Sequence, residues 1–216
     1  MKKLNIIYED KEILVVNKPS KLLTVGTDKE RERTLYHEVR EYLHKKNQKV
    51  FVVHRLDKDT SGIVLFAKNP RLKELLQRDW IRYTREYRAV VEGKLPKIKD
   101  TLRFYLQEDK NHHVYVSDKG LSSVTEYEVL DTNKTQSLIS VRIKTGRKNQ
   151  IRASLAYIGN PIVGDKKYDA KINSLSRLGL HANRLVIKHP ITGKEMTFIS
   201  KAPKVFYLGF KDYNEE

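Results

Sequence analysis

The chain has 216 residues, of which 39% are hydrophobic and none is cysteine. This size suits one domain with its own core, and the lack of cysteine excludes disulfides and thiolate metal sites. The 43 lysines and arginines outnumber 27 acidic residues, which gives a formal net charge of +16. Such a charge favours nucleic-acid binding over a merely solvated surface. Charges interrupt residues 1–16 and no apolar stretch is long enough to span a membrane, so we expect a soluble, cytoplasmic protein without a signal peptide.

The first elements are a hairpin and a helix. Apolar residues 6–8 and 13–16 flank the polar turn EDKE, which predicts a β-hairpin. Thr34 suits the N-cap of a helix in which Leu35, Val39 and Leu43 share one face with Tyr42.

The middle of the chain combines strands with a second helix. Runs rich in β-formers at 50–53 and 63–68 predict two strands. Asn69 and Pro70 suit the start of a helix that carries apolar residues as far as Trp80. The runs REYRAVVEG and HHVYVSD predict further strands, whereas we expect the irregular stretch at 92–113 to be largely a surface excursion.

The last part of the chain predicts two hairpins around a helix. SVTEYEVL and SLISVRIKT are joined by the polar DTNKTQ, and RLVIKHPITGKEMTFIS turns at HPITGK. Between them, NQIRASLAYIG has apolar residues at helical spacing and ends on Gly159 as a C-cap. Strands do not alternate regularly with helices. The pattern therefore predicts an α+β fold with a mixed, mostly antiparallel central sheet flanked by helices.

The loop HRLDKDTSG at 54–62 contains two aspartates, which could bind a metal, form a turn or take part in a reaction. The spacing from Asp57 to Gly62 matches the first half of an EF-hand calcium loop. The position that needs a glutamate is Lys68, and the flanking segments are β-like, so we exclude a metal. A tight turn explains Asp59 and the residues after it, whereas Asp57 follows a strand that would fix it for chemistry.

Several motifs, in the same order, resemble those of the RluA-type pseudouridine synthases. HRLDKDTSGIVLFAK resembles the catalytic HRLDxxTSGxxxxAK of that family, and REYRAVVEG resembles its KxYxAxVxG strand. TGRKNQIRASLAYIGNPIVGDKKY resembles TGRxHQIRxHxxxxGxPxxGDxxY. Segments near both ends of the chain also resemble family motifs, so that the matches together span about residues 4–203. The resemblance implies the pseudouridine synthase catalytic fold as a single domain over 1–216. We expect no S4 RNA-binding domain, which many relatives carry.

The resemblance also implies roles for individual residues. It implies isomerisation of uridine to pseudouridine in ribosomal or transfer RNA, without a cofactor or metal. Asp57 matches the essential aspartate, Tyr87 the active-site tyrosine, and Arg152 the basic residue that pairs with the aspartate. Arg55 matches an arginine associated with displacing the target base. His54 also suits a structural hydrogen bond at the strand end. The expected RNA-binding residues are His54, Arg55, Thr60, Arg147 and Gln150.

The chemistry explains why a carboxylate and a guanidinium would be used together. The reaction breaks the bond from N1 to C1′ and remakes it from C5. A carboxylate can attack carbon or take a proton and still leave again. Burial alone favours the uncharged form of a carboxyl group, and an arginine that stays cationic when desolvated opposes this. The sequence leaves open whether Asp57 adds to the sugar or base, or removes a ribose proton.

Other interpretations of these residues stay open. Tyr87 could be a core tyrosine, and Arg152 a phosphate contact or a solvated helix residue. The whole chain could be an inactive RNA-binding or ribosome-associated module on the same scaffold. A glycosidase using Asp57 and Asp59 would explain neither the charge nor the later motifs.

The chain departs from the family motifs at three positions. Lys21 replaces a glycine, and Asn149 and Ser154 replace histidines. The two histidine replacements should affect substrate choice more than the reaction. We expect no membrane association and no obligatory protein partner, with a monomer as the default.

Overall fold

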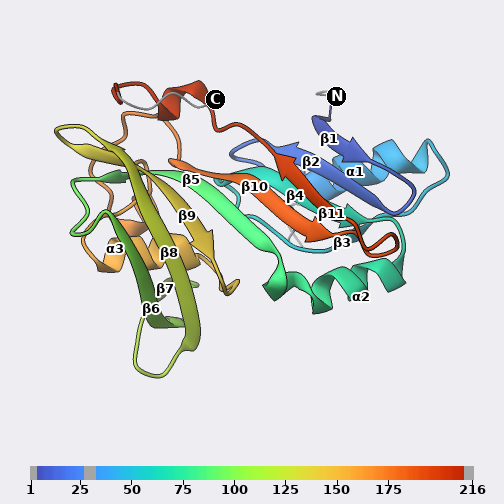
Figure 1. Cartoon of the computed structure of the whole chain (residues 1–216), viewed down its shortest axis with the longest axis horizontal. Helices are drawn as coiled ribbons and strands as arrows, with labels where there is room; N and C mark the ends of the chain where they lie inside the picture. Colours follow the sequence, from blue (N-terminus) through green and yellow to red (C-terminus); the bar gives the residue numbers. More distant parts are fainter. Residues whose placement is uncertain (1–3, 27–32, 212–216) are drawn as a thin grey trace. The chain divides into compact units, whose positions relative to one another are not determined.

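The structure is a computed structural model that describes residues 4–26 and 33–211 (Figure 1). The chain divides into two compact units, of which the first comprises Met1–Tyr83 and Ala182–Lys201 and the second Thr84–His181 and Ala202–Glu216. Strand β10 (Leu180–Lys188) begins in the second unit and continues through the first. Among the described residues, none of the helices has the length and apolarity needed to cross a membrane. A single domain over the whole chain stays a prediction.

The first unit has a sheet with the order β1-β2-β4-β10. The short β3 pairs with β4, and β11 pairs antiparallel with β10. The β1–β2 and β10–β11 pairs confirm the two predicted hairpins. The bounds of these strands are β1 Ile6–Glu9, β2 Ile13–Lys18, β3 Phe51–Val52, β4 Ser61–Ala67 and β11 Glu195–Ile199.

The core of the first unit is centred on β2 and β4, which are buried on both faces. Ile13 and Val15 lie on the same side as Ile63 and Leu65, and α2 (Pro70–Arg78) packs there through two leucines. The alternate residues of both strands are also fully buried, as are three residues on one face of α1 (Leu35–His44). Burial on both faces explains why β2 and β4 read as nearly continuous apolar runs.

The two helices of this unit begin where the sequence predicts. The Thr34 hydroxyl accepts a hydrogen bond from the His37 amide at 3.1 Å, and the Asn69 side chain accepts from the Leu72 amide at 2.9 Å. These bonds satisfy amides that a helix start leaves unpaired. The sequence predicted that this helix reaches Trp80, and that prediction is wrong. Trp80 belongs to a separate 3₁₀ turn, η1 (Trp80–Arg82).

The second unit has an antiparallel sheet with the order β5-β9-β8-β6-β7. Helix α3 (Gln150–Tyr157) lies beside β6, β7 and β8 (Figure 1) and packs Ile151 and Leu155 onto the sheet's apolar face. Gly159, at a φ of 83°, ends this helix in a Schellman motif, which confirms its predicted place. The remaining bounds are β5 Thr84–Glu92, β6 Lys99–Glu108, β7 Val114–Val116, β8 Leu121–Thr132, β9 Gln136–Ile143, η2 Lys166–Tyr168 and η3 Lys204–Phe206.

Strand β6 corrects the expectation that residues 92–113 form a surface excursion. It is ten residues long and pairs with both β7 and β8. Leu102 and Leu106 are buried, while Arg103 and Tyr105 between them are exposed. The segment has the two-residue period of a strand, but the charged residues flanking it obscure that pattern. The predicted α+β class with mostly antiparallel pairing is confirmed.

Candidate active site

Asp57 occupies the first position of a tight turn that leads into β4. The Thr60 amide donates to the Asp57 carbonyl at 3.2 Å, which closes a β-turn over residues 57–60. Asp57 is half-buried, and its neighbour Leu56 is buried. The turn predicted around Asp59 is therefore present, and it presents Asp57 at its start.

The backbone of this turn is held by residues 18–24, a segment that begins with the last residue of β2. The Thr24 hydroxyl donates to the Leu56 carbonyl at 2.8 Å and accepts from the Leu56 amide at 3.1 Å. The Ser20 hydroxyl donates to the Asp59 carbonyl at 2.7 Å. With these bonds on both sides of it, the backbone at Asp57 is fixed by tertiary contacts as well as by its own turn.

Lys18 is the most buried element of this support. Its side chain has no exposed surface, and its ammonium group donates to the carbonyls of Pro19, Leu22 and Lys58 at 3.1, 2.6 and 3.0 Å. A buried ammonium is tolerated when all of its donors have partners. Lys58, whose carbonyl Lys18 binds, directly follows Asp57 in the chain. The predicted site residues did not include Lys18, although it lies in the NKP of the N-terminal motif that carries the family resemblance.

Gly62 fits the start of β4 because no side chain could stand there. A Cβ at this position would lie 2.2 Å from the carbonyl oxygen of Ala182, and the backbone φ is 114°. The glycine of the motif thus allows β4 and β10 to approach closely just after the turn. Thr60 is buried, with an exposed fraction of 2%. Its contact with RNA stays a prediction.

His54 and Arg55, which precede Asp57, have different surroundings. The Nε2 atom of His54 accepts a hydrogen bond from the Leu65 amide at 3.0 Å, and its ring stacks on Trp80 with centroids 4.2 Å apart. His54 is therefore the structural hydrogen-bonding residue that the sequence suggested. Arg55 is exposed, as a residue that contacts RNA must be, and its role at the target base stays a prediction.

Tyr87 lies in β5 of the second unit, opposite Val141 of β9. Its ring is half-buried and packs against the cluster that contains Ala89 and Val91, as its strand position predicts. The packing fits a core tyrosine, and the remaining exposure fits a ring that meets a substrate. The geometry of this unit is compatible with both roles.

Arg152 lies in the first turn of α3 and is bound by a carboxylate that the sequence analysis did not single out. Its Nε and Nη2 atoms donate to Oδ2 and Oδ1 of Asp165, each at 2.7 Å. Both side chains are buried. The aromatic ring of Tyr168 lies 5.3 Å from the guanidinium carbon. Asp165 and Tyr168 stand at the specified D and Y positions of the GDxxY motif that the resemblance includes, and that motif could have identified them.

The loop before α3 is shaped by Gln150. Its side-chain oxygen accepts from the Thr145 hydroxyl and the Arg147 amide, and its nitrogen donates to the Val124 carbonyl and the Thr125 hydroxyl. Gln150 is buried and holds the loop in place. Its contact with RNA stays a prediction. Arg147 is exposed, while its Nε atom donates to the Ser122 carbonyl at 3.0 Å.

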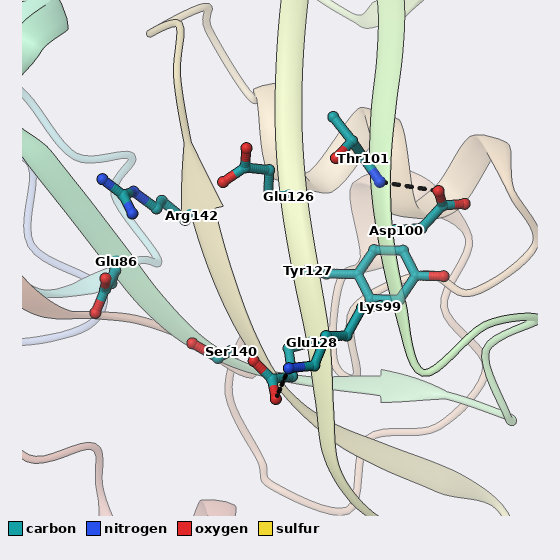
Figure 2. Close-up of a pocket in the computed structure, with 9 residues that line it drawn as sticks. All are labelled: Glu86, Lys99, Asp100, Thr101, Glu126, Tyr127, Glu128, Ser140 and Arg142. Carbon is teal, nitrogen blue, oxygen red and sulfur yellow. Dashed lines mark hydrogen bonds and ion pairs between the residues drawn. The ribbon is translucent and has the colours of Figure 1, made fainter.

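A pocket of about 570 Å³ lies elsewhere in the second unit, over strands β5, β9, β8 and β6 (Figure 2). Glu86 lines it, and because side chains alternate along a strand, Tyr87 points to the other face. Its charged lining consists of four carboxylates and two cations, Lys99 and Arg142. Such a lining disfavours phosphate, and the pocket contains none of the predicted site residues.

The candidate residues divide between the two units. Asp57 and its supporting segment belong to the first, while Tyr87, Arg152 and Asp165 belong to the second. The Asp57–Arg152 pair therefore stays a prediction. Across the described residues, no group of three or more His, Asp or Glu side chains is placed to hold a metal ion.

Comparison with known sequences identifies the family. Residues 12–157 match the family described as RNA pseudouridylate synthase, a range that includes Asp57, Tyr87 and Arg152. The uncharacterized RNA pseudouridine synthase YhcT of Bacillus subtilis is 35% identical over 208 residues, covering 93% of this chain and 68% of that protein. The ribosomal large subunit pseudouridine synthase D of Buchnera aphidicola is 34% identical over 227 residues, covering 93% of this chain and 70% of that protein.

Comparison with solved structures identifies the same fold. Human RNA pseudouridylate synthase domain containing 1 superposes with a TM-score of 0.79 at 22% identity, covering 98% of this chain and 89% of that one. Human RNA pseudouridylate synthase domain containing 4 gives a TM-score of 0.77, also at 22% identity, covering 94% and 90%. The fold expected from the sequence is thereby confirmed. The family match and the curated relatives confirm the predicted RluA-type resemblance. The extent of the family match and the identity to these relatives show that this chain belongs to the RNA pseudouridylate synthase family of enzymes.

Proposed function

We propose that this protein isomerises specific uridines to pseudouridine in RNA, with Asp57 as the catalytic carboxylate. Ribosomal RNA is the first substrate to test, because one relative carries the name of a ribosomal large subunit pseudouridine synthase. Transfer RNA is the second. The substrate and product have the same atoms and oxidation state, so the reaction needs no net redox partner.

The observation that carries the proposal is the support given to the Asp57 turn. Lys18, Ser20 and Thr24 hold the backbone at Lys58, Asp59 and Leu56. Catalysis by a side chain requires that its position be held to within a fraction of an ångström. A surface turn without a function needs no buried ammonium group beneath it. The support therefore favours Asp57 as a positioned reactive group over a simple turn residue.

In the proposed reaction, Asp57, Arg152 and Tyr87 each have a separate role. As the bond from N1 to C1′ breaks, Asp57 either adds to the nucleotide or removes a ribose proton, and when C5 bonds to C1′ it is released or returns that proton. Arg152 keeps a neighbouring carboxylate charged in a site from which water is excluded. Tyr87 stacks on the uracil and relays to water the proton that leaves C5, while N1 takes up a proton from water.

RNA binding completes the proposal. A stacked uridine must leave its neighbours to reach a half-buried carboxylate, which costs a few kcal/mol and less in a loop. Arg55 is exposed two residues before Asp57, so it can hold a phosphate or fill the vacated space. We place the protein in the cytoplasm, where its RNA substrates are, and expect a monomer to suffice.

The direct test measures pseudouridine formation by tritium release from [5-³H]uridine-labelled RNA. We expect the wild-type protein to release tritium from ribosomal RNA and Asp57→Asn to lose at least about 10³-fold in rate, because the reactive carboxylate is gone. Asp59→Asn is the matched control, since Asp59 is an exposed aspartate of the same turn. It should keep most of the wild-type rate.

The outcomes separate the proposed enzyme from the alternative of an inactive RNA-binding module. Binding of RNA without tritium release from either RNA class, by folded wild-type protein, would support the module. Equal rates in wild type and Asp57→Asn would instead move the chemistry to another residue. Pseudouridine mapping in RNA from cells with and without the gene then locates the modified position.

A further inference from the structure

Arg152 is held on more than one side within the second unit. Asp165 binds its Nε–Nη2 edge through two bonds of 2.7 Å, and the Tyr168 ring faces its guanidinium carbon at 5.3 Å. The exposed fractions of the Arg152 and Asp165 side chains are 9% and 1%. A bidentate pair of this kind fixes the plane of the guanidinium as well as its position.

Asp165 is itself held rigidly by the short segment around it. Its amide donates to the Ile162 carbonyl at 3.0 Å, and its carbonyl accepts from the amides of Tyr168 and Ala170, both at 3.1 Å. The Tyr168 hydroxyl donates to the Val114 carbonyl of β7 at 2.9 Å. The carboxylate therefore stands on a turn that is anchored to the sheet and cannot follow the arginine if the arginine moves.

Stability alone is a weak reason for such a pair. Taking two charges out of water costs several kcal/mol, and apolar side chains of similar size often stabilise a core equally well. A guanidinium has five N–H donors in a rigid plane, and Asp165 engages two of them. Another edge of the same plane can engage a second carboxylate, provided that the plane has the right orientation.

We propose that Asp165 is a positioning residue that holds the Arg152 guanidinium in the one orientation that the proposed reaction requires. This inference rests on the proposed function and extends it by one residue, which lies outside the 12–157 range of the family match. Asp165 touches neither substrate nor reacting atoms in this scheme. It acts through Arg152, so its effect should appear in the rate of the chemical step and vanish when Arg152 cannot respond.

The first experiment compares Asp165→Asn with the wild type. Asparagine has nearly the same shape but lacks the charge and one acceptor, so it cannot keep the bidentate pair. We expect kcat to fall about 10- to 100-fold, while the KM for RNA changes less than about threefold, because misplacement of a catalytic group mainly slows the chemical step. Asp169→Asn is the matched control. Asp169 is exposed in the same segment and has a φ of 58°, which asparagine also adopts.

A double-mutant cycle separates positioning from general structural damage. Lysine at 152 keeps the charge but cannot form the bidentate pair, so adding Asp165→Asn to Arg152→Lys should lower kcat less than about twofold further. Independent effects that multiply would overturn the proposal, because they would mean that Asp165 acts other than through Arg152. A thermal melt of each variant identifies losses that come from unfolding.

The remaining outcomes are also decisive. If Asp165→Asn does not fold, Asp165→Glu keeps the buried charge and displaces the carboxylate by one methylene, and it should show the same fall in kcat. Wild-type kcat in a folded Asp165→Asn or Asp165→Glu protein would overturn the inference while leaving the proposed function intact. Failure of the proposed function itself would appear earlier, as absence of tritium release from the wild-type protein.

Discussion

A single hydroxyl separates the two roles of Tyr87. The ring packs against the core of the second unit in either case, but only a proton relay requires the hydroxyl for the reaction. The same distinction applies to Asp57, where backbone anchoring is observed and the reaction is proposed. At the scale of the residue, the informative substitutions are therefore those that remove one polar atom and leave the packing unchanged.

Tyr87→Phe should lower kcat by about 10²-fold or more if the hydroxyl moves the C5 proton, because acid–base groups contribute about that much. Single-turnover tritium release measures the rate, and a thermal melt checks the fold. Tyr127→Phe is the matched control, since Tyr127 is a buried tyrosine of the same core cluster, and its rate should match the wild type. An unchanged rate in Tyr87→Phe would leave only the core role.

Several elements of the first unit are joined at Glu9, the last residue of β1. Its carboxylate accepts hydrogen bonds from Lys68 after β4 at 2.9 Å, from Tyr42 of α1 at 2.7 Å and from Lys46 at 3.0 Å. Burial by itself raises the pKa of Glu9, but these three bonds outweigh it and lower the pKa to about 2. The anchored carboxylate thus ties β1, β4 and α1 together at one end of the sheet.

The lowered pKa of Glu9 makes stability depend on pH in a defined direction. An unfolded glutamate binds a proton near pH 4.5, whereas folded Glu9 stays ionised to about pH 2. Its contribution is therefore complete above about pH 5 and is lost progressively as the pH falls toward 2. Glu9→Gln should be less stable than wild type by about 1–3 kcal/mol at pH 6, and the difference should shrink by pH 3.

Urea unfolding at the two pH values measures this difference. Glu74→Gln, which removes an exposed glutamate of α2, serves as the control and should stay close to wild type at both. A Glu9→Gln deficit that is the same at pH 6 and pH 3 would show that the ionised hydrogen bonds contribute nothing specific.

The net charge acts at the scale of the whole molecule. A formal charge of +16 attracts RNA regardless of its sequence, and each phosphate that a cation neutralises makes binding more salt-dependent. This long-range attraction brings the substrate to the protein. The few positioned side chains near the target uridine then decide which base reacts.

RNA affinity should therefore fall steeply with salt. If about four phosphates of a single strand are neutralised, the slope of log K against log salt is about −3, or roughly a 50-fold loss between about 50 and 200 mM. Arg147→Gln should reduce the slope by about 0.7, because one phosphate contact is removed. Lys134→Gln, at the opposite end of the β8–β9 hairpin, should leave it unchanged. Filter binding at several salt concentrations measures both, and a slope near zero would refute electrostatic binding.

Local patterns predicted most of the elements. Thr34 and Asn69 mark helix starts because their side chains bond amides only three residues away, and Gly159 marks a helix end because its backbone conformation favours glycine. Strand β6 was missed because Leu102 and Leu106 are recognisable as inward-facing strand residues only once β8 is known to pair beside them. Trp80 was placed in the wrong element because an apolar residue at helical spacing does not show where the helix ends, and its ring stacks on His54, 26 positions earlier in the chain.

The available chemistry could be read from the residues alone: a positive charge suited to RNA, no thiolates, and an aspartate, a tyrosine and an arginine in family motifs. The groups that support those residues became identifiable only in the folded chain. Lys18 bonds a carbonyl 40 residues away, and Asp165 meets Arg152 across a helix end and a turn. A buried charge is stable only where folding brings its partners to it, and no local pattern in the chain specifies which partners those will be.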